Sequence, residues 1–513
     1  MQKEKFLKEY LVERKGTYSL KWDALDKRFG NANLTSMWVA DMEIKAPKEV
    51  IEALKERCEH GVFGYSYVSD EYYNSVINWL KEKHNYEIKK EWLRFTNGVV
   101  TAIYCFVNIF TKVDDAILIL TPVYYPFHNA VKDNNRKLIT CDLKNTDGYF
   151  TIDYEEVEKK IVENKIKLFI QCSPHNPAGR VWKEEELAKI LEICKKYNVL
   201  VISDEIHQDI TMKGYKHIPS AIVANGKYAD NLITVSAASK TFNLAGLIHS
   251  NIIISNDELR KKYDEEIKKI NQTEINILGM LATQVAYEKG SEWLENVKEI
   301  IEDNFNYLKT ELNKHIPEIT ITNLEGTYLV FLDLRKIIPI DKVKEFIQDK
   351  CNLAIDFGEW FGASFKGFIR INLATDPEIV KKAVESIISE YKKLRDNTPT
   401  PNLRMRVNEG ISLTMNDFAI PGNVITKKLK ADHVVPMKKI VTMEGFDKLS
   451  SEQQLSVLNF EENFIGLSKS ANTSKGAKSY SDWTMYKKTN TPINPILREE
   501  MIRKAPIFEG KLY

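Results

Sequence analysis

Short apolar runs alternate with longer amphipathic stretches over the first half of the chain. The runs fall at 116–120, 137–141, 168–172, 199–203, 232–236 and 251–254, and a helical pattern, KEEELAKILEICKKY, occupies 183–197 between two of them. Runs that are apolar at successive positions are typical of strands buried on both faces, and their alternation with helices indicates a parallel sheet. The pattern therefore predicts an α/β fold with a mostly parallel sheet and helices on both faces.

The pattern changes in the second half of the chain. Beyond residue 280, long helical stretches lead to two β segments at 327–333 and 368–372, which predict a smaller α+β domain. Around 395–404, the segment RDNTPTPNLR places prolines among polar residues and reads as a linker. We expect an N-terminal arm with part of the small domain at 1–45, a large domain at 46–285, a small domain at 286–394, a linker at 395–404 and a separate module at 405–513.

Composition and charge exclude some classes of protein for this chain. With 513 residues, 43% hydrophobic and 28% charged, the chain has a globular composition that excludes a disordered or disulfide-stapled protein. The net charge of +1 provides no overall field for nucleic acid or membrane, but it divides unevenly. Residues 1–396 carry 56 basic and 60 acidic side chains, and residues 397–513 carry 17 and 12. This asymmetry supports two modules of different origin.

Cysteine use and the first residues of the chain suggest a location. The six cysteines form no CxxC pair, and all lie in the first 351 residues, which is typical of reduced thiols in the cytoplasm. The first ten residues, MQKEKFLKEY, lack an apolar signal core, and the longest apolar runs are too short to cross a bilayer. We expect a cytoplasmic protein without a membrane partner.

Polar residues follow three of the predicted strands. Asn176 lies in SPHNPAGR after 168–172, Asp204 in SDEIH after 199–203, and Lys240 in SAASKTFN after 232–236. A lone lysine there is usually a surface residue and a lone aspartate usually caps a helix, but parallel sheets bind ligands at this edge. A pyridoxal phosphate site requires these three groups together: an amine for the Schiff base, a carboxylate at the pyridine nitrogen and an amide at the phenolic oxygen.

The same segments carry a family resemblance. SPHNPAGRVW, SDEIHQD and SKTFNLAGL resemble the fold-type I pyridoxal phosphate enzymes of aminotransferase class I/II. MWVADMEIKAP at 37–47, GVFGYS at 61–66 and TPVYYPF at 121–127 are similar to the cysteine-S-conjugate β-lyase branch, whose members act as cystathionine β-lyases. The resemblance covers about residues 1–394.

The resemblance implies roles around the cofactor ring. Lys240 forms the Schiff base and, once displaced by substrate, removes the Cα proton. Asp204 lies against the ring nitrogen, so that the ring withdraws electrons, and Asn176 donates to the phenolic oxygen. His207 is expected as a second partner near that oxygen, although a packed core histidine is the alternative. Tyr124 stacks on the ring face.

It also implies how the phosphate is held. FTNGVV opens a predicted helix, and a helix N-terminus with a glycine suits an anion because unpaired amides and the helix dipole converge there. The backbone N–H groups of Gly98, Val99 and Val100 are therefore expected at the phosphate. The hydroxyls of Ser236 and Ser239 are expected near the same group.

Three further residues are implied by the family. Tyr65 matches a tyrosine that reaches the phosphate from the other subunit, which implies a homodimer. Arg370, in GFIRINLA, matches an arginine that binds the substrate carboxylate, for which a guanidinium fork is suited. Tyr125 is a weaker candidate for a substrate contact, since an aromatic residue after a strand more often packs in the core.

Two reactions, elimination of a thiol and amino transfer, use the same set of residues. In a C–S β-lyase, removal of the Cα proton is followed by loss of a thiol from cystathionine, cysteine or a cysteine S-conjugate, giving pyruvate and ammonia. In an aminotransferase, the same proton returns to the cofactor instead. The catalytic residues do not separate the two, but the branch motifs favour elimination. The sequence says nothing for or against the regulatory role that some relatives of this branch have.

The C-terminal module has a resemblance of its own. ADHVVPM at 431–437 and the stretch LNFEENFIGLSKSANTSKGAKSYSDW at 458–483 resemble HNH-type nucleases of bacterial toxin systems. In that chemistry, a histidine activates water and a divalent metal stabilises the phosphate oxyanion. The resemblance implies His433 as the base, Asp432 as a metal ligand, Asn459 or Asn463 as the central asparagine, and Asn472 near the second metal-ligand position.

The lysines of this stretch, Lys469, Lys475 and Lys478, are expected to face phosphates of a nucleic acid. The module departs from the pattern, because the last histidine of the usual motif is an asparagine and no zinc-binding cysteine pairs are present. A decayed nuclease or an unrelated basic interaction module is the alternative. A third view makes the chain chiefly a nucleic-acid-cleaving effector, but the complete set of cofactor residues argues against a mere carrier.

Overall fold

The computed structural model describes residues 3–396, 399, 401–449 and 451–512, and it divides the chain into two compact units. The first comprises Met1–Lys336 and Ile347–Ser386, and the second comprises Ile337–Phe346 and Ile387–Tyr513. Residues 397, 398 and 400 of the predicted linker lie outside the described residues. The later part of that segment begins a helix at Pro401, a residue whose fixed φ suits the first helical turn. No helix of the described stretches is both long enough and apolar enough for a membrane span.

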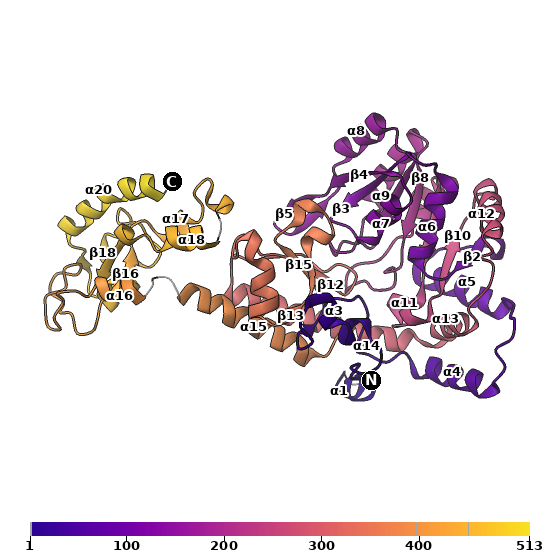
Figure 1. Cartoon of the computed structure of the whole chain (residues 1–513), viewed down its shortest axis with the longest axis horizontal. Helices are drawn as coiled ribbons and strands as arrows, with labels where there is room; N and C mark the ends of the chain where they lie inside the picture. Colours follow the sequence, from indigo (N-terminus) through magenta and orange to yellow (C-terminus); the bar gives the residue numbers. More distant parts are fainter. Residues whose placement is uncertain (1–2, 397–398, 400, 450, 513) are drawn as a thin grey trace. The chain divides into compact units, whose positions relative to one another are not determined.

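A seven-stranded sheet forms the centre of the first unit (Figure 1). One strand, β10, runs antiparallel to the other six, so the prediction of a mostly parallel sheet is confirmed. In spatial order the strands are β2 (Leu93–Thr96), β10 (Ser250–Ile253), β9 (Leu232–Ser236), β8 (Leu200–Asp204), β7 (Leu168–Cys172), β3 (Ala116–Thr121) and β4 (Lys137–Asp142).

The predicted strands lie within about a residue of those observed, and β2 was missed. Its four residues, LRFT, include Arg94, whose guanidinium pairs with Asp264 instead of lying in the core. A short strand with a charged residue has no apolar run for sequence reasoning to detect. The helix predicted at 183–197 is α9 (Glu184–Lys196).

The sheet is covered on both faces. Every residue of β3, β7 and β9 is buried, which requires packed layers above and below because successive side chains point to opposite faces. One core is shared by the strands with α6 (Val99–Phe110), α7 (Pro126–Asp133) and α12 (Asp257–Lys269). Helices α8 (Tyr154–Asn164) and α9 pack against β4 and β8 outside that core.

A second, antiparallel sheet lies in the same unit. Its order is β11 (Thr320–Ile321), β12 (Leu329–Asp333), β15 (Phe368–Asn372) and β14 (Asp356–Phe357), and it contains both β segments predicted for the small domain. Near the N-terminus, β1 (Thr35–Ser36) pairs in parallel with β13 (Leu353–Ala354), so residues from both ends of this unit meet. The remaining elements are α1 (Lys3–Tyr10), α2 (Leu20–Asp23), α3 (Leu25–Phe29), α4 (Lys48–His60), α5 (Asp70–His84), β5 (Lys144–Thr146), β6 (Tyr149–Thr151), α10 (Val223–Gly226), α11 (Ala238–Thr241), α13 (Ile277–Lys289), α14 (Ser291–His315) and α15 (Pro377–Asp396).

The second unit has its own core, centred on the buried Trp483 and on apolar residues between 419 and 508. Its main sheet is the antiparallel pair β16 (Lys430–His433) and β17 (Phe464–Leu467), followed directly by α19 (Lys469–Lys475). The other elements are α16 (Pro401–Arg406), α17 (Met437–Ile440), α18 (Ser451–Leu458), β18 (Met485–Tyr486), β19 (Thr491–Pro492) and α20 (Pro495–Leu512).

Candidate active site

The carboxyl ends of β7, β8 and β9 bring the predicted polar residues together. Cys172 pairs with Asp204, and Asp204 with Val235, so the three strands end in register. Asn176 lies in the loop after β7, and Lys240 in α11 after β9. Asp204 itself is the last residue of β8, one position earlier relative to the strand end than the sequence suggested. Its strand position fixes the direction of its side chain more firmly than a loop would.

Asp204 is a buried carboxyl group. Burial raises its pKa to about 7, opposed by the backbone N–H of Ile206, which donates to Oδ1 at 3.1 Å, and by the charge of Lys240. A carboxylate in such surroundings is strongly favoured by a nearby cation or protonated nitrogen. The group is therefore suited to holding a proton on a bound heterocycle.

Lys240 is a partly buried amine with a single hydrogen-bond acceptor in contact. Its Nζ donates to the carbonyl oxygen of Ala40 at 2.7 Å. Desolvation lowers the pKa of Lys240 to about 8, and the positive charge of Arg370 acts in the same direction, while Asp41 and Asp204 oppose it. A sizeable fraction of the amine is therefore neutral near pH 8, which a nucleophile or base requires.

Arg370 links the second sheet to the loop after β7. Lying in β15, it donates from Nη1 to Oδ1 of Asn176 at 3.0 Å and from Nη2 to the carbonyl of Trp38 at 2.9 Å. Nη2 also pairs with Oδ2 of Asp356, the residue opposite in β14. Nε of Arg370 is buried without a partner among the described residues, so part of the guanidinium is available to a carboxylate.

Sequence reasoning missed Asp356. It lies in a two-residue strand, and nothing in the local sequence marks it as a partner of an arginine 14 positions later. Burial raises the pKa of Asp356 to about 6 against the opposing charges of Arg370 and Arg28. The side chain holds Arg370 in place while leaving its own Oδ1 without a hydrogen bond among the described residues.

Four aromatic or imidazole side chains lie around these groups. His207 is buried and burial lowers its pKa well below the usual value, so its imidazole is neutral. Its ring lies 5.8 Å from that of Tyr328, edge to face. Tyr124, whose backbone N–H donates to the carbonyl of Asn176 at 3.2 Å, and the neighbouring Tyr125 lie with ring centroids 5.5 Å apart. Burial raises the pKa of both phenols, so they stay protonated.

The N-terminus of α6 holds the three residues whose amides are expected at the phosphate. Gly98 caps the helix with a φ of +98°, and its own N–H already donates to the carbonyl of Thr96 at 2.9 Å. The amides at the first positions of the helix, those of Val99, Val100 and Thr101, precede the first intrahelical bond, which runs from the N–H of Ala102 to the carbonyl of Gly98. Ser236 is buried at the end of β9, a strand against which α6 packs, and Ser239 lies in α11.

Tyr65 is different from the other candidates. Its side chain is fully exposed, as are large parts of Val62, Phe63 and Tyr67 in the same extended segment. Within one chain it therefore contributes nothing to the buried site.

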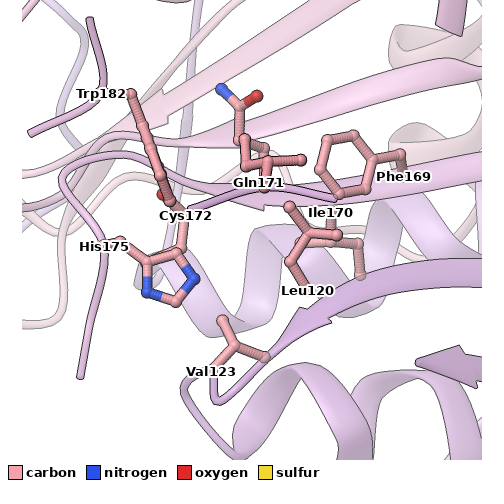
Figure 2. A pocket seen from close by; sticks show the side chains of 9 residues that line it. Leu120, Val123, Phe169, Ile170, Gln171, Cys172, His175 and Trp182 are labelled. Carbon is pink, nitrogen blue, oxygen red and sulfur yellow. The ribbon is translucent and has the colours of Figure 1, made fainter. Parts of the chain in front are cut away.

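A small cavity lies beside the end of β7 and the loop that follows it (Figure 2). Cys172, His175 and Trp182 line it together with apolar side chains, and burial lowers the pKa of His175 to about 3. The backbone N–H of Asn176 donates to Sγ of Cys172 at 3.4 Å, and Nε1 of Trp182 donates to the carbonyl of Cys172 at 2.9 Å. The cavity is too small for an amino acid, and these two hydrogen bonds help to hold the loop after β7.

The arrangement fits a pyridoxal phosphate. An amine of lowered pKa, a buried carboxyl group, an amide and a helix N-terminus are the groups such a cofactor needs, and they meet at one edge of the sheet. His207 Nδ1 and Arg370 Nε, both buried and without a partner among the described residues, are further polar atoms available to ligands.

In the second unit, the residues of the HNH resemblance are mostly engaged by the protein itself. His433 ends β16, and its Nε2–H donates to the carbonyl of Leu458 at 2.8 Å, while burial lowers the pKa of this histidine to about 4. Asn463 is buried and bonds the backbone of Val435 through both Oδ1, at 2.7 Å, and Nδ2, at 3.3 Å. Asn459 bonds the carbonyl of Leu455.

Asp432 is paired with a lysine that was expected to face phosphates. Lys475 is 1% exposed and its Nζ lies 2.7 Å from Oδ2 of Asp432, while Lys469 and Lys478 are exposed. Asn472 lies in α19, one turn before Lys475. No group of three or more His, Cys, Asp or Glu side chains that could hold a metal occurs in the described parts of the chain. With its one carboxylate neutralised by a buried ammonium, this donor set does not fit a divalent metal.

The sequence of the chain matches a known protein family. Residues 33–387, more than half of the sequence, match the family of aminotransferases of class I and II, and the chain belongs to that family.

Its relatives include enzymes that cleave carbon–sulfur bonds. The chain is 37% identical over 361 residues to cystathionine beta-lyase PatB of Bacillus subtilis (strain 168), which covers 70% of this chain and 93% of that protein. Among solved structures, it is similar to cystalysin from Treponema denticola, which contains pyridoxal 5'-phosphate (38% identity, TM-score 0.72, 75% of this chain and 98% of that chain). It is also similar to a PLP-bound C-S lyase from Staphylococcus hominis (36% identity, TM-score 0.70, 74% and 97%).

Proposed function

We propose that the chain is a pyridoxal phosphate-dependent C–S β-lyase that releases a thiol, pyruvate and ammonia from cystathionine, cysteine or a cysteine S-conjugate. The observation that carries the proposal is the convergence of Asp204, Lys240 and Arg370, from separate segments, on one edge of the sheet. The similarity to PatB, cystalysin and a C-S lyase supports elimination over amino transfer.

Each residue has a defined task in this reaction. Arg370 binds the substrate α-carboxylate through its available Nε edge, and Asp356 keeps the guanidinium in place. Lys240 removes the Cα proton at Nζ. The bound cofactor supplies an electron sink for the pair left by that proton. Asp204 stabilises a proton on the ring nitrogen, and because Oδ1 of Asn176 accepts from Arg370, its Nδ2 amide is the end that donates to the phenolic oxygen.

The phosphate site and the ring face complete the proposal. The amides of Val99 and Val100 and the hydroxyls of Ser236 and Ser239 bind the phosphate, while Tyr124 covers the ring and Tyr125 borders the substrate. His207, a neutral imidazole, would be the second partner of the phenolic oxygen.

The first test is the absorbance spectrum and product analysis of purified protein. We expect a visible band from cofactor joined to Lys240, lost in Lys240→Ala, and release of pyruvate and free thiol from L-cystathionine that falls by at least about 10³-fold in the variant. Lys183→Ala, at an exposed position, is the matched control and should behave as wild type. A band without pyruvate, but with amino transfer to a keto acid, would assign the chain to the aminotransferases.

We also propose a homodimer in a reducing, cytoplasmic setting. The exposed apolar residues Val62, Phe63 and Tyr67 flank the fully exposed Tyr65, and such a patch is typical of a surface covered by another subunit. All six cysteines are free thiols. Sedimentation equilibrium should give twice the chain mass, and Tyr65→Ala should release cofactor more readily than wild type. A monomer with normal cofactor retention would refute the dimer.

As a second candidate, we propose that the C-terminal module acts on nucleic acid in the manner of HNH proteins. Its support is the order β16, β17, α19, with His433 at the end of the first strand and Asn463 directly before the second. The ion pair of Asp432 with Lys475 opposes a metal-dependent reaction. Incubation of the full chain with supercoiled plasmid, with and without Mg²⁺ or Mn²⁺, decides the matter: nicking that is lost in His433→Ala supports a nuclease, and retention on DNA without nicking supports a binding module.

A further inference from the structure

The backbone carbonyls of residues 38–44 are held by side chains from distant parts of the fold. This segment lies within MWVADMEIKAP at 37–47, one of the motifs that resemble the β-lyase branch. Asn372 donates from Nδ2 to the carbonyls of Val39 and Asp41, both at 2.6 Å. Further bonds run from Arg370 to Trp38 at 2.9 Å, from Tyr328 to Ala40 at 2.8 Å, and from Asn243 to Met42 at 3.0 Å and Ile44 at 2.8 Å.

Two donors meet at the carbonyl of Ala40. The hydroxyl of Tyr328 donates to this oxygen at 2.8 Å, and Nζ of Lys240 donates to it at 2.7 Å. The three residues come from the N-terminal segment, from the position directly before β12 and from α11, so the tertiary fold brings them together. A carbonyl has two lone pairs and accommodates both donors.

The hydroxyl of Tyr328 is a hydrogen-bond donor whose position and protonation are fixed by its surroundings. It is buried, its backbone carbonyl accepts from the N–H of Leu373 at 2.8 Å, and burial together with the charge of Asp41 raises the pKa of its phenol well above the usual value. Its hydroxyl therefore stays protonated and able to donate near neutral pH. The neighbouring carbonyls, bonded by Asn372, prevent the Ala40 peptide from turning away.

We propose that Tyr328 is a positioning residue that fixes the Ala40 carbonyl as the docking point of the free Lys240 amine while that amine takes the Cα proton. This inference rests on the proposed function for its substrate class. The Cα–H bond breaks and an N–H bond forms at Nζ, the amine becomes an ammonium, and the electron pair stays on the substrate, from which the bound cofactor withdraws it. One N–H of Lys240 donates to Ala40 before and after the transfer.

The Tyr328 hydroxyl acts on this step in two ways. It holds the Ala40 carbonyl, and with it the Lys240 amine, in place. Displacing such a base by even about 1 Å from its working position can lower the rate about 10²-fold. It also draws electron density from the Ala40 oxygen, which weakens the stabilisation of the Lys240 ammonium and keeps the amine ready to act as a base. Tyr328→Phe removes both effects and deletes one oxygen atom.

The experiment compares Tyr328→Phe with Tyr72→Phe. Tyr72 is a matched control, because it is also buried and its hydroxyl also makes two hydrogen bonds, to His249 and Asn251 at 2.7 Å, away from Lys240. Holoenzyme in D₂O is incubated with L-alanine, which cannot lose a thiol, and loss of the Cα proton signal is followed by NMR. We expect exchange to slow about tenfold in Tyr328→Phe and to change less than about twofold in Tyr72→Phe.

A second readout does not depend on turnover. Cofactor-free protein is mixed with pyridoxal phosphate over a range of pH, and the rate of recombination reports the titration of the Lys240 amine. We expect Tyr328→Phe to move the midpoint to higher pH, because the Ala40 carbonyl then accepts from the Lys240 ammonium alone and stabilises it more. We expect Tyr72→Phe to leave the midpoint unchanged. Thermal unfolding of both variants checks that they fold.

The outcomes separate the two proposals. Equal exchange rates and equal midpoints for the two variants would overturn the role of Tyr328. If wild-type holoenzyme exchanges the proton of alanine but releases no pyruvate from cystathionine, the lyase proposal fails while the positioning role stands. Should Tyr328→Phe not fold, Asn372→Ser, which loosens the carbonyls on both sides of Ala40, is expected to slow exchange in its place, and unchanged exchange would count against the inference.

Discussion

Asp204 and Lys240 carry opposite charges in water, and burial moves their pKa values towards each other, to about 7 and about 8. Both shifts have the same cause, since the interior disfavours the charged form of an acid and of a base alike. The consequence is a site in which proton positions are finely balanced before any cofactor binds. The residue types provide a carboxyl group and an amine, and burial in the site shifts the pKa values on which their reactivity depends.

The burial of Asp204 predicts a pH-dependent stability of the cofactor-free protein. A raised carboxyl pKa means that the folded state binds more protons than the unfolded state between about pH 4 and pH 7, so this group's contribution to stability falls as the pH rises through that range. Between about pH 5 and pH 8 the loss amounts to roughly 3 kcal/mol. Denaturant unfolding of wild type and Asp204→Asn without cofactor measures it.

The variant serves as the reference in that measurement. Asp204→Asn has no titrating group there, so its stability should gain on the wild type as the pH increases. If the difference in free energy of unfolding between wild type and Asp204→Asn were the same at about pH 5 and pH 8, Asp204 would be ionised in the folded protein at both.

At the scale of an element, the N-terminus of α6 depends on one glycine. Gly98 has a φ of +98°, a conformation that side chains rarely adopt, and this turn aims the first amides of the helix towards the edge of the sheet where β9 ends. A Cβ at this position would meet Ile248 at an ordinary 3.7 Å, so the difficulty of a substitution is backbone strain and not lack of room.

Gly98→Ala is therefore expected to weaken cofactor binding. Backbone strain of about 1–3 kcal/mol is relieved by turning the amides of Val99 and Val100, which raises the dissociation constant of the cofactor about tenfold. Gly30→Ala is the control, since Gly30 has a φ of +74° and open space around it but ends α3. Titration of cofactor-free variants with pyridoxal phosphate should show no comparable loss for Gly30→Ala, and an equal loss in both would remove the phosphate role from α6.

At the scale of the whole molecule, the chain consists of two units with separate cores. All of the candidate cofactor and substrate residues other than Tyr65 are buried or partly buried in the first unit, and the core around Trp483 belongs to the second. Independent cores are the mark of domains that can work separately.

Shortening the chain tests this independence. A protein ending after residue 396, which keeps all of α15, should retain its kcat/KM for L-cystathionine within about threefold of the full chain, because no residue assigned to the reaction is removed. The measurement is pyruvate release at matched cofactor occupancy, with thermal unfolding as the check on folding. A loss of activity in a folded, cofactor-loaded protein would show that the second unit contributes to catalysis.

The sequence by itself determined the order of strands and helices, the residues at the strand ends and the family, because buried strands and their polar ends leave a local pattern in the chain. Only the tertiary structure decided the contacts that join distant segments: Lys240 and Tyr328 on the carbonyl of Ala40, and Asp356 on Arg370. The tertiary structure also pairs the N–H of Gly98 with the carbonyl of Thr96 and buries Lys475 against Asp432. Such contacts depend on how layers pack across up to about 300 residues of sequence, and no local pattern of hydrophobic and polar positions encodes them.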